Sequence, residues 1–225
     1  MKHLRVPFFA CLFTVLSALF AQSAFAGQPS YDIPGKIDPA ENYLFFIHNY
    51  YVETKGPDGD CKYQDILEAF VKQGFTVISE IRTGKIIPCT YSQKIVRQVN
   101  TLLDGGVPPG NIIVSGHSKG GAITLCVASQ LNNPDVKFVV MAGCGIAGII
   151  KYKMYPDFTK LQGRVLSVYA GSDKVASSCG ESFSKASFGL DHTEIKLESD
   201  GGHRLFFAPD ETWLPPVVDW IKTKR

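Results

Sequence analysis

Residues 111–121 read NIIVSGHSKGG, in which an apolar run passes directly into a turn with a glycine on each side of a serine. The run predicts a buried strand over its first seven residues, and the pattern that follows predicts a helix from Ser118 to Leu131. Gly116 and Gly120 stand where strand and helix would approach too closely to leave room for a Cβ atom. A G-x-S-x-G pattern between a strand and a helix is typical of a nucleophilic serine held on a sharp turn.

The rest of the chain alternates between strand and helix patterns. Short apolar or alternating runs predict five further strands, at 42–49, 75–82, 136–143, 163–171 and 192–198. Apolar residues at helical spacing predict three further helices, at 63–74, 90–106 and 211–225. This order indicates an α/β domain with about six strands in a doubly wound, mostly parallel sheet. Right-handed crossovers would place the carboxyl ends of the strands at one edge, where such sheets build their sites.

The first 26 residues have the pattern of a signal peptide. Lys2 and Arg5 precede an apolar run, and the small residues Ala24 and Ala26 occupy the two positions that a signal peptidase reads. Cleavage after Ala26 would leave residues 27–225 as a single α/β domain that is periplasmic or secreted. An uncleaved membrane anchor is the alternative, because the apolar run is nearly long enough to span a bilayer. After cleavage we expect no membrane association.

The charge of the chain is balanced, with 23 lysine and arginine residues, 21 aspartate and glutamate residues and a formal net charge of +2. Its basic residues form no stripe along the sequence. Nucleic acid is therefore not an expected partner.

Cysteine usage agrees with export, because an oxidising compartment permits disulfides. Five cysteines remain after the signal peptide, so at least one thiol is left over. Cys126 lies in an apolar helix pattern and is expected to be a small buried side chain. Among the other four we favour Cys61–Cys89 and Cys144–Cys179, because each pair would join loops at the same edge of the sheet. None of these cysteines has the spacing of zinc ligands.

At the opening turn the sequence resembles the α/β-hydrolase superfamily. GHSKGG at 116–121 is similar to the family's nucleophile elbow, and the resemblance runs from FFIHNY at 45–50 to the last predicted helix. The family order of serine, acid and histidine implies Ser118 as nucleophile, Asp173 as acid and His203 as base. Asp173 follows the fifth predicted strand, and His203 lies in the loop after the sixth. The competing residues are His192, Asp191 and Asp200.

The resemblance also implies an oxyanion hole. One donor should be the backbone N–H of Lys119, the residue after the nucleophile. The second should come from the loop after the first strand, where the family usually has His-Gly and this chain has His48-Asn49. We expect the Tyr50 N–H to be this donor, with the Asn49 N–H as the alternative. Asparagine tolerates left-handed backbone better than most residues, so a glycine-like turn stays feasible.

Two segments bear on the substrate. Larger relatives insert a cap domain after the strand that follows the elbow helix, but here only residues 144–162 fill that interval, so we expect no cap domain. Residues 145–158, GIAGIIKYKMYPDF, either line an open cleft or pack on the core. Arg82, after the second strand, either binds a substrate carboxylate or forms a surface ion pair. Arg82 and Asn49 would make the rim polar, which favours accessible esters over insoluble fats.

These features predict an exported serine hydrolase, most simply a carboxylesterase that forms an acyl-enzyme through Ser118. A thioesterase, amidase or peptidase would use the same residues, because the fold does not specify the leaving group. A dienelactone-hydrolase-like enzyme normally carries a cysteine at this position. A non-catalytic binding protein on a hydrolase scaffold is the alternative of a different class. The expected partner is a small-molecule ester or acyl substrate, with no cofactor and no metal, and the oligomeric state stays open.

Overall fold

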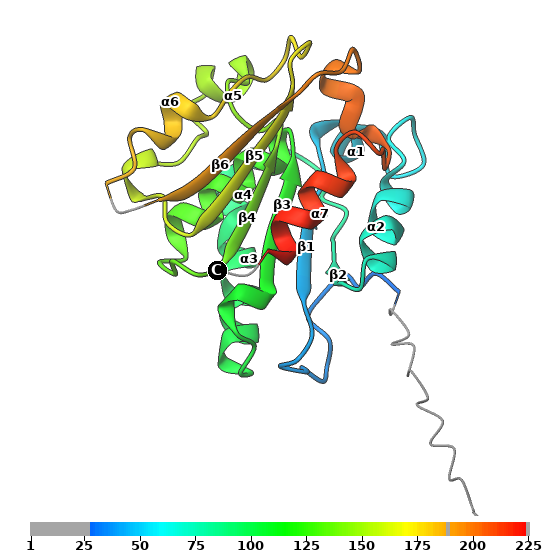
Figure 1. Cartoon of the computed structure of the whole chain (residues 1–225), viewed down its shortest axis with the longest axis vertical. Helices are drawn as coiled ribbons and strands as arrows, with labels where there is room; N and C mark the ends of the chain where they lie inside the picture. Colours follow the sequence, from blue (N-terminus) through cyan, green and yellow to red (C-terminus); the bar gives the residue numbers. More distant parts are fainter. Residues whose placement is uncertain (1–27, 188–189, 224–225) are drawn as a thin grey trace, which may run out of the picture.

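The computed structural model describes residues 28–187 and 190–223, which form a six-stranded sheet with helices on both faces (Figure 1). All neighbouring strands are parallel, in the order β2-β1-β3-β4-β5-β6. The strands are β1 (Tyr43–Ile47), β2 (Thr76–Ile78), β3 (Ile112–His117), β4 (Lys137–Met141), β5 (Arg164–Ala170) and β6 (Asp191–Leu197). The expected signal peptide at 1–26 lies outside the described residues and stays a prediction.

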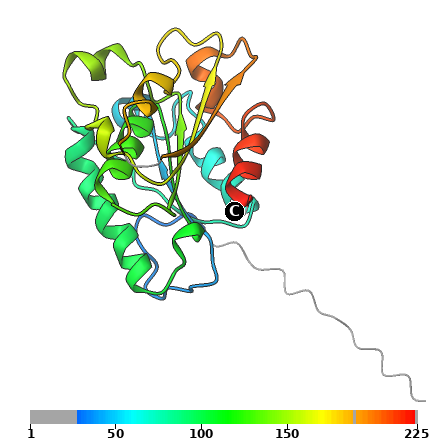
Figure 2. The same ribbon diagram turned by 60° about the vertical axis from the view of Figure 1, so that its left-hand side comes forward.

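Helices cover both faces of the sheet, and Figure 2 shows α3 (green) and α7 (red) on opposite sides of it. The longer helices are α2 (Tyr63–Lys72), α3 (Pro88–Asp104), α4 (Lys119–Gln130) and α7 (Leu214–Lys222). The short ones are α1 (Tyr50–Lys55), α5 (Ala147–Lys151) and α6 (Gly180–Phe183), with the 3-10 turns η1 (Pro109–Asn111), η2 (Phe158–Lys160) and η3 (Gly202–Phe207).

Strand β1 shows why the strands are apolar throughout. Its side chains alternate between two hydrophobic cores, with Tyr43, Phe45 and Ile47 on the α3 and α4 side and Leu44 and Phe46 on the α2 and α7 side. A parallel strand covered on both faces must be apolar at every position. Both cores and the six strands lie within the described residues.

The fold class predicted from the sequence is confirmed, and each of the six predicted strands is present. β2 is shorter than the expected run at 75–82, because the chain leaves the sheet after Ile78. Beyond that point the Ser79 amide donates a hydrogen bond to the Ser30 carbonyl oxygen at 2.8 Å, an ordinary N–H···O length. The Arg82 amide donates to the ring of His48 at 2.8 Å. After Ile78, the backbone amides of this segment thus bond to Ser30 and to the ring of His48 instead of to the backbone of β1.

One of the two favoured disulfides is wrong. Cys144 is bonded to Cys179 as expected, but Cys89 is bonded to Cys126, and among the described cysteines Cys61 is free and buried. Cys61 belongs to the core on the α2 and α7 side, whereas Cys89 and Cys126 lie on α3 and α4, which pack together on the other face. The sheet therefore separates Cys61 from Cys89. Cys126, which we expected to be only a small buried side chain, forms a disulfide with Cys89.

The Cys144–Cys179 bond should contribute substantially to stability. The two cysteines are separated by 35 residues in the sequence, and a cross-link closing a loop of that size removes about 4 kcal/mol of chain entropy from the unfolded state. We expect Cys144→Ser/Cys179→Ser to lower the free energy of unfolding by about this amount in urea titrations at equilibrium. Because the separation in Cys89–Cys126 is 37 residues, Cys89→Ser/Cys126→Ser should produce a similar loss. Unchanged stability in both variants would contradict the expectation.

Candidate active site at the carboxyl edge of the sheet

Ser118 occupies the sharp turn between β3 and α4. Its φ is 58°, in the left-handed region, and its ψ is −118°; a non-glycine residue holds such a conformation only where its surroundings impose it. A Cβ atom on Gly120 would lie 1.9 Å from the carbonyl oxygen of Ile47, and one on Gly116 would lie 2.4 Å from the backbone of Gly120. The two glycines let α4 approach β1 and β3 closely, and the turn presents the serine hydroxyl at the edge of the sheet.

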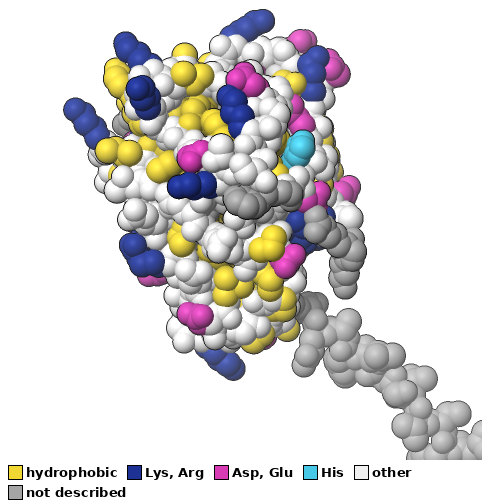
Figure 3. Space-filling view, turned by 90° about the vertical axis from the view of Figure 1, so that its left-hand side faces the viewer, with side chains coloured by type: hydrophobic (Ala, Val, Ile, Leu, Met, Phe, Trp, Pro, Cys, Tyr) yellow, Lys and Arg dark blue, Asp and Glu magenta, His cyan; other side chains and the backbone are white. Residues whose placement is uncertain are grey.

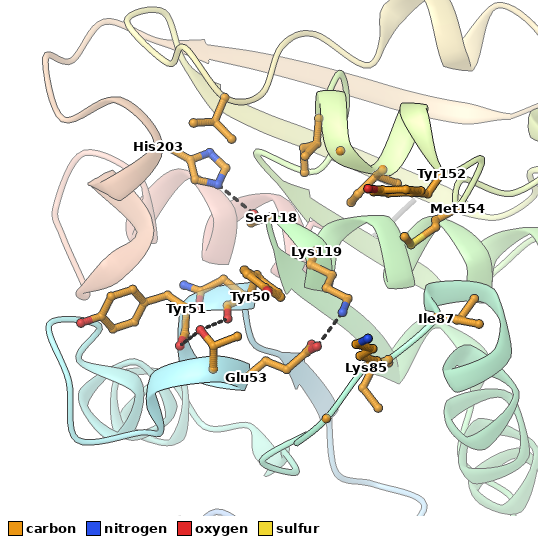
Figure 4. A pocket seen from close by; sticks show the side chains of 18 of the residues that line it. Tyr50, Tyr51, Glu53, Lys85, Ile87, Ser118, Lys119, Tyr152, Met154 and His203 are labelled. Carbon is orange, nitrogen blue, oxygen red and sulfur yellow. Dashed lines mark hydrogen bonds and ion pairs between the residues drawn. The ribbon is translucent and has the colours of Figure 1, made fainter.

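The three residues expected to form a triad lie in one hydrogen-bonded row (Figure 4 shows its Ser118–His203 part). Ser118 Oγ is 2.8 Å from His203 Nε2, and His203 Nδ1 is 2.8 Å from Asp173 Oδ2. The carboxylate accepts a hydrogen bond from Nδ1–H, which leaves Nε2 unprotonated and able to take the serine proton. A serine hydroxyl in this arrangement can transfer its proton to the imidazole as it attacks an electrophile.

The turn after β5 fixes Asp173. Its other carboxylate oxygen, Oδ1, accepts hydrogen bonds from the backbone N–H groups of Val175 at 2.7 Å and Ala176 at 3.0 Å. The side chain of Asp173 is completely buried, while 15% of the His203 side chain is exposed. The carboxylate therefore has no freedom to turn away from the imidazole. The amide of Ser177, in the same loop, donates to the carbonyl oxygen of Cys144, beside the disulfide.

The competing residues lie elsewhere. Asp191 is the first residue of β6 and pairs with Arg164 at the opposite edge of the sheet, 3.1 Å away. The ring of His192 packs against Phe183, with 5.1 Å between ring centroids. Asp200 shares a loop with His203, yet the carboxylate that His203 contacts is that of Asp173.

Two backbone amides are candidates for binding an oxyanion. Tyr50 is the first residue of α1 and Lys119 the first of α4, so neither amide has a partner within its own helix. Within the described part of the chain neither donates a hydrogen bond to another residue. Both residues line the same cleft as Ser118. The arrangement leaves two N–H groups available to an oxygen bound beside the serine.

Asn49 holds the loop between β1 and α1. Its side-chain oxygen caps α1 by accepting from the Val52 amide at 2.9 Å, and its side-chain amide donates to His117 Nδ1 at 3.1 Å. Asn49 adopts ordinary extended backbone, with φ at −78° and ψ at 178°. A left-handed glycine is therefore not needed here, because the asparagine side chain fixes the position of Tyr50 instead.

The structure does not place Arg82 in the cleft. Only 2% of Arg82 is exposed, and its guanidinium donates to the carbonyl oxygen of His48 and lies 3.6 Å from the carboxylate of Glu53. Glu53 also accepts a hydrogen bond from the ammonium of Lys119 at 2.6 Å (Figure 4). The expected polar rim is thus absent at this position, since both Asn49 and Arg82 are buried. The role of Glu53 could not be predicted from the sequence, because it is a single acidic residue in a helix too short to show helical periodicity.

Two buried histidines adjoin the site and stay uncharged. Burial and the neighbouring Arg82 lower the pKa of His48 to about 3. Its Nδ1–H donates to the Asn49 carbonyl oxygen, and its Nε2 accepts from Arg82. Burial and then the proximity of His203 lower the pKa of His117, whose ring packs 4.9 Å from that of His203. Both rings therefore serve as neutral packing and hydrogen-bonding groups at neutral pH.

Ser118 and His203 open into a cleft of about 1350 Å³. The segment after β4 contributes one apolar wall, through Ile146, Ile149, Tyr152 and Met154, and the loop before α3 contributes Lys85 and Ile87. The first part of segment 145–158 thus lines the cleft, whereas Tyr155 and Phe158 pack against the core on the α3 and α4 side, so the segment has both of the roles that the sequence allowed. The segment forms the short helix α5 with flanking turns. No cap domain covers the cleft in the described residues.

Two further kinds of site are absent from the described residues. No group of histidine, cysteine, aspartate or glutamate side chains in 28–187 and 190–223 is arranged to hold a metal ion. Over the same residues, no helix has the length and apolar character needed to cross a membrane.

Comparison with known proteins identifies the fold. No protein-family model matches the sequence, and no curated protein matches it significantly. A protein assigned as a dienelactone hydrolase from Klebsiella pneumoniae subsp. pneumoniae MGH 78578 matches with a TM-score of 0.61 and 13% identity, over 85% of this chain and 90% of that chain.

Two esterases give similar matches. An esterase from Rhizomucor miehei matches with a TM-score of 0.59 and 14% identity, over 85% of this chain and 77% of that chain. For Est1E from Butyrivibrio proteoclasticus the TM-score is 0.57 at 14% identity, over 85% of this chain and 89% of that chain. Together with the sheet order, these matches show that the chain has the α/β-hydrolase fold.

Proposed function

We propose that the chain is an exported serine hydrolase, and specifically a carboxylesterase. The observation that carries the proposal is the unbroken row from Ser118 through His203 to Asp173, with both contacts at 2.8 Å. The neighbours named as esterases support the same chemistry. The two disulfides support export, because such bonds persist in oxidising compartments.

The reaction would proceed in two halves. Ser118 Oγ attacks the carbonyl carbon of the ester while His203 Nε2 takes the serine proton, and the carbonyl oxygen becomes an oxyanion facing the Tyr50 and Lys119 amides. Collapse of this intermediate breaks the ester bond, and His203 gives its proton to the departing alcohol. Water then attacks the acyl-enzyme with His203 again as base, which releases the acid and restores Ser118.

The test is covalent labelling of residues 27–225 with a fluorophosphonate, which reacts with activated serines. We expect one labelled site, located by mass spectrometry at Ser118. Ser115, in β3, donates its hydroxyl to the Phe45 carbonyl oxygen at 2.8 Å and should stay unlabelled. A folded protein that does not label would favour the non-catalytic binding protein. If Ser118 labels, oxygen esters should turn over faster than matched thioesters and amides of the same acyl group.

Asn49→Ala should lower kcat by about 10²-fold, because Tyr50 would no longer be held where its amide meets the oxyanion, and one such donor is worth 10² to 10³ in kcat. Steady-state kinetics on a soluble p-nitrophenyl ester measure this loss. Removing the α1 cap should also lower the free energy of unfolding by about 1 kcal/mol.

Two variants separate positioning from capping. Asn49→Ser retains a capping oxygen and should recover part of the activity. Asp157→Ala removes the cap of η2, where Asp157 accepts from the Thr159 amide at 3.1 Å and does not line the cleft. It should reduce stability without changing kcat. If Asn49→Ala retains wild-type kcat, the assignment of the Tyr50 amide is wrong.

A further inference from the structure

Exposed apolar side chains gather at the mouth of the cleft. Large hydrophobic side chains exposed on the described part of the chain are Tyr31, Tyr50, Ile87, Ile150, Tyr152 and Val175. All except Tyr31 surround the cleft, and we call these five the rim. Four of the five line the cleft itself, and Ile150 lies on α5 between lining residues. Tyr152 is 64% exposed and Ile87 58%. Apolar side chains concentrated in this way mark an interaction site more often than isolated ones do.

Lysines accompany the rim without acidic partners. Lys85 precedes Ile87, Lys151 and Lys153 flank Tyr152, and Lys174 precedes Val175. We call these four the rim lysines; all are exposed, and none forms an ion pair with another described residue. Ion pairs engage Lys72, Lys94, Lys185 and Lys196 elsewhere on the surface, whereas the exposed Lys36, Lys55, Lys62 and Lys222 form none with another described residue. In the view of Figure 3, dark blue side chains lie beside yellow ones at the upper left of the molecule.

Two acidic groups near the mouth already have positively charged neighbours. Glu53 is the acid that lines the cleft, and 1% of its side chain is exposed, between Arg82 and Lys119. Asp157 is the sole acid of segment 145–160; it accepts from Thr159 and lies 4.0 Å from Lys160. The surface around the cleft therefore presents apolar side chains together with unpaired positive charge.

We propose that the rim and the rim lysines dock the protein on the surface of an anionic phospholipid bilayer, with the cleft facing the lipid. Apolar side chains can insert at the headgroup boundary while the lysine ammonium groups remain at the level of the phosphates. This contact is peripheral and needs no spanning helix. It differs from the expectation, drawn from cleavage of the signal peptide, that the mature chain has no membrane association. Docking does not require catalysis. The presentation of membrane esters to Ser118 does, and that part rests on the proposed function.

The experiment is flotation of residues 27–225 carrying Ser118→Ala with vesicles of phosphatidylcholine, either pure or mixed with phosphatidylglycerol. We expect flotation with the mixed vesicles, weakened by salt, and little with the neutral ones. Lys151→Gln/Lys153→Gln should weaken the binding to mixed vesicles by about 30-fold, because each lysine near an anionic surface contributes about fivefold. Ile150→Ser/Tyr152→Ser should weaken the part of the binding that salt does not remove.

The matched control is Lys72→Gln/Lys222→Gln, which removes the same charge at the ends of α2 and α7, beside the amino ends of the strands. It should bind as the parent does. Circular dichroism and thermal unfolding establish that each variant is folded. Absence of flotation with mixed vesicles, equal flotation with neutral vesicles, or an equal loss in the control pair would each overturn the proposal.

Catalysis is measured separately, so that the two hypotheses fail independently. With Ser118 restored, Lys151→Gln/Lys153→Gln should hydrolyse soluble p-nitrophenyl acetate within about twofold of the wild-type kcat/KM, because neither lysine lines the cleft. Vesicle binding without any ester hydrolysis would retain the docking surface and reject the esterase. Hydrolysis without vesicle binding would do the reverse.

Discussion

Ser118→Ala should lower kcat for ester hydrolysis by about 10⁴- to 10⁶-fold and abolish fluorophosphonate labelling. The substitution removes the oxygen that would become bonded to the acyl group, and the remaining groups can only polarise the ester for attack by water. KM should change much less, because the walls of the cleft are untouched. Activity is measured under substrate saturation, with labelling and intact mass as the second readout.

The matched control is Ser129→Ala on the same helix. Ser129 donates its hydroxyl to the carbonyl oxygen of Cys126 at 2.9 Å, far from any base. This variant should retain both kcat and labelling. Alanine at 118 also has to adopt the φ of 58° that the turn imposes, so a circular dichroism spectrum must establish that the fold is intact. Undiminished hydrolysis by a folded Ser118→Ala variant would exclude the proposed mechanism.

Asp173→Asn should lower kcat by about 10⁴-fold while preserving the fold. The oxygen of the asparagine side chain can still accept from the Val175 and Ala176 amides, so the turn is retained. Its NH₂ group would then face His203 Nδ1 and favour the tautomer with the proton on Nε2. That tautomer cannot accept the proton of Ser118, which is the reason for a loss of this size.

Asp157→Asn is the control for this change. Asp157 holds a turn in the same way, accepting from the Thr159 amide, but it contacts no imidazole. We expect its kcat to equal that of the wild type, and we expect both variants to unfold at similar urea concentrations. Equal, small losses of kcat in the two variants would mean that Asp173 is only a turn-capping residue.

The sequence predicted the sheet well because its strands are buried on both faces and therefore read as continuous apolar runs. The proximity of Ser118, Asp173 and His203 could be predicted for a related reason. Parallel strands bring their carboxyl ends to one edge, so residues in the turns and loops that follow β3, β5 and β6 lie near one another. Position in the topology supplied this information, without any knowledge of side-chain contacts.

The features that escaped prediction depend on contacts between distant segments. Cys89 pairs with Cys126 because α3 packs along α4, which no spacing in the sequence encodes. Arg82 follows a strand, as a residue that binds substrate could, but its side chain turns inward to Glu53. Helices α1 and α5 contain six and five residues, too few to show helical periodicity.

The buried ion pairs also give the loop of Tyr50 a local excess of positive charge. Arg82 and Lys119 bring two positive charges and Glu53 one negative charge, while the low pKa of His48 keeps that ring neutral. The group therefore carries one net positive charge behind the loop of Tyr50. In a poorly solvated wall such a charge acts over several ångströms. A substrate oxygen that gains negative charge there would be attracted by this excess positive charge, even though the carboxylate of Glu53 lies beside Lys119.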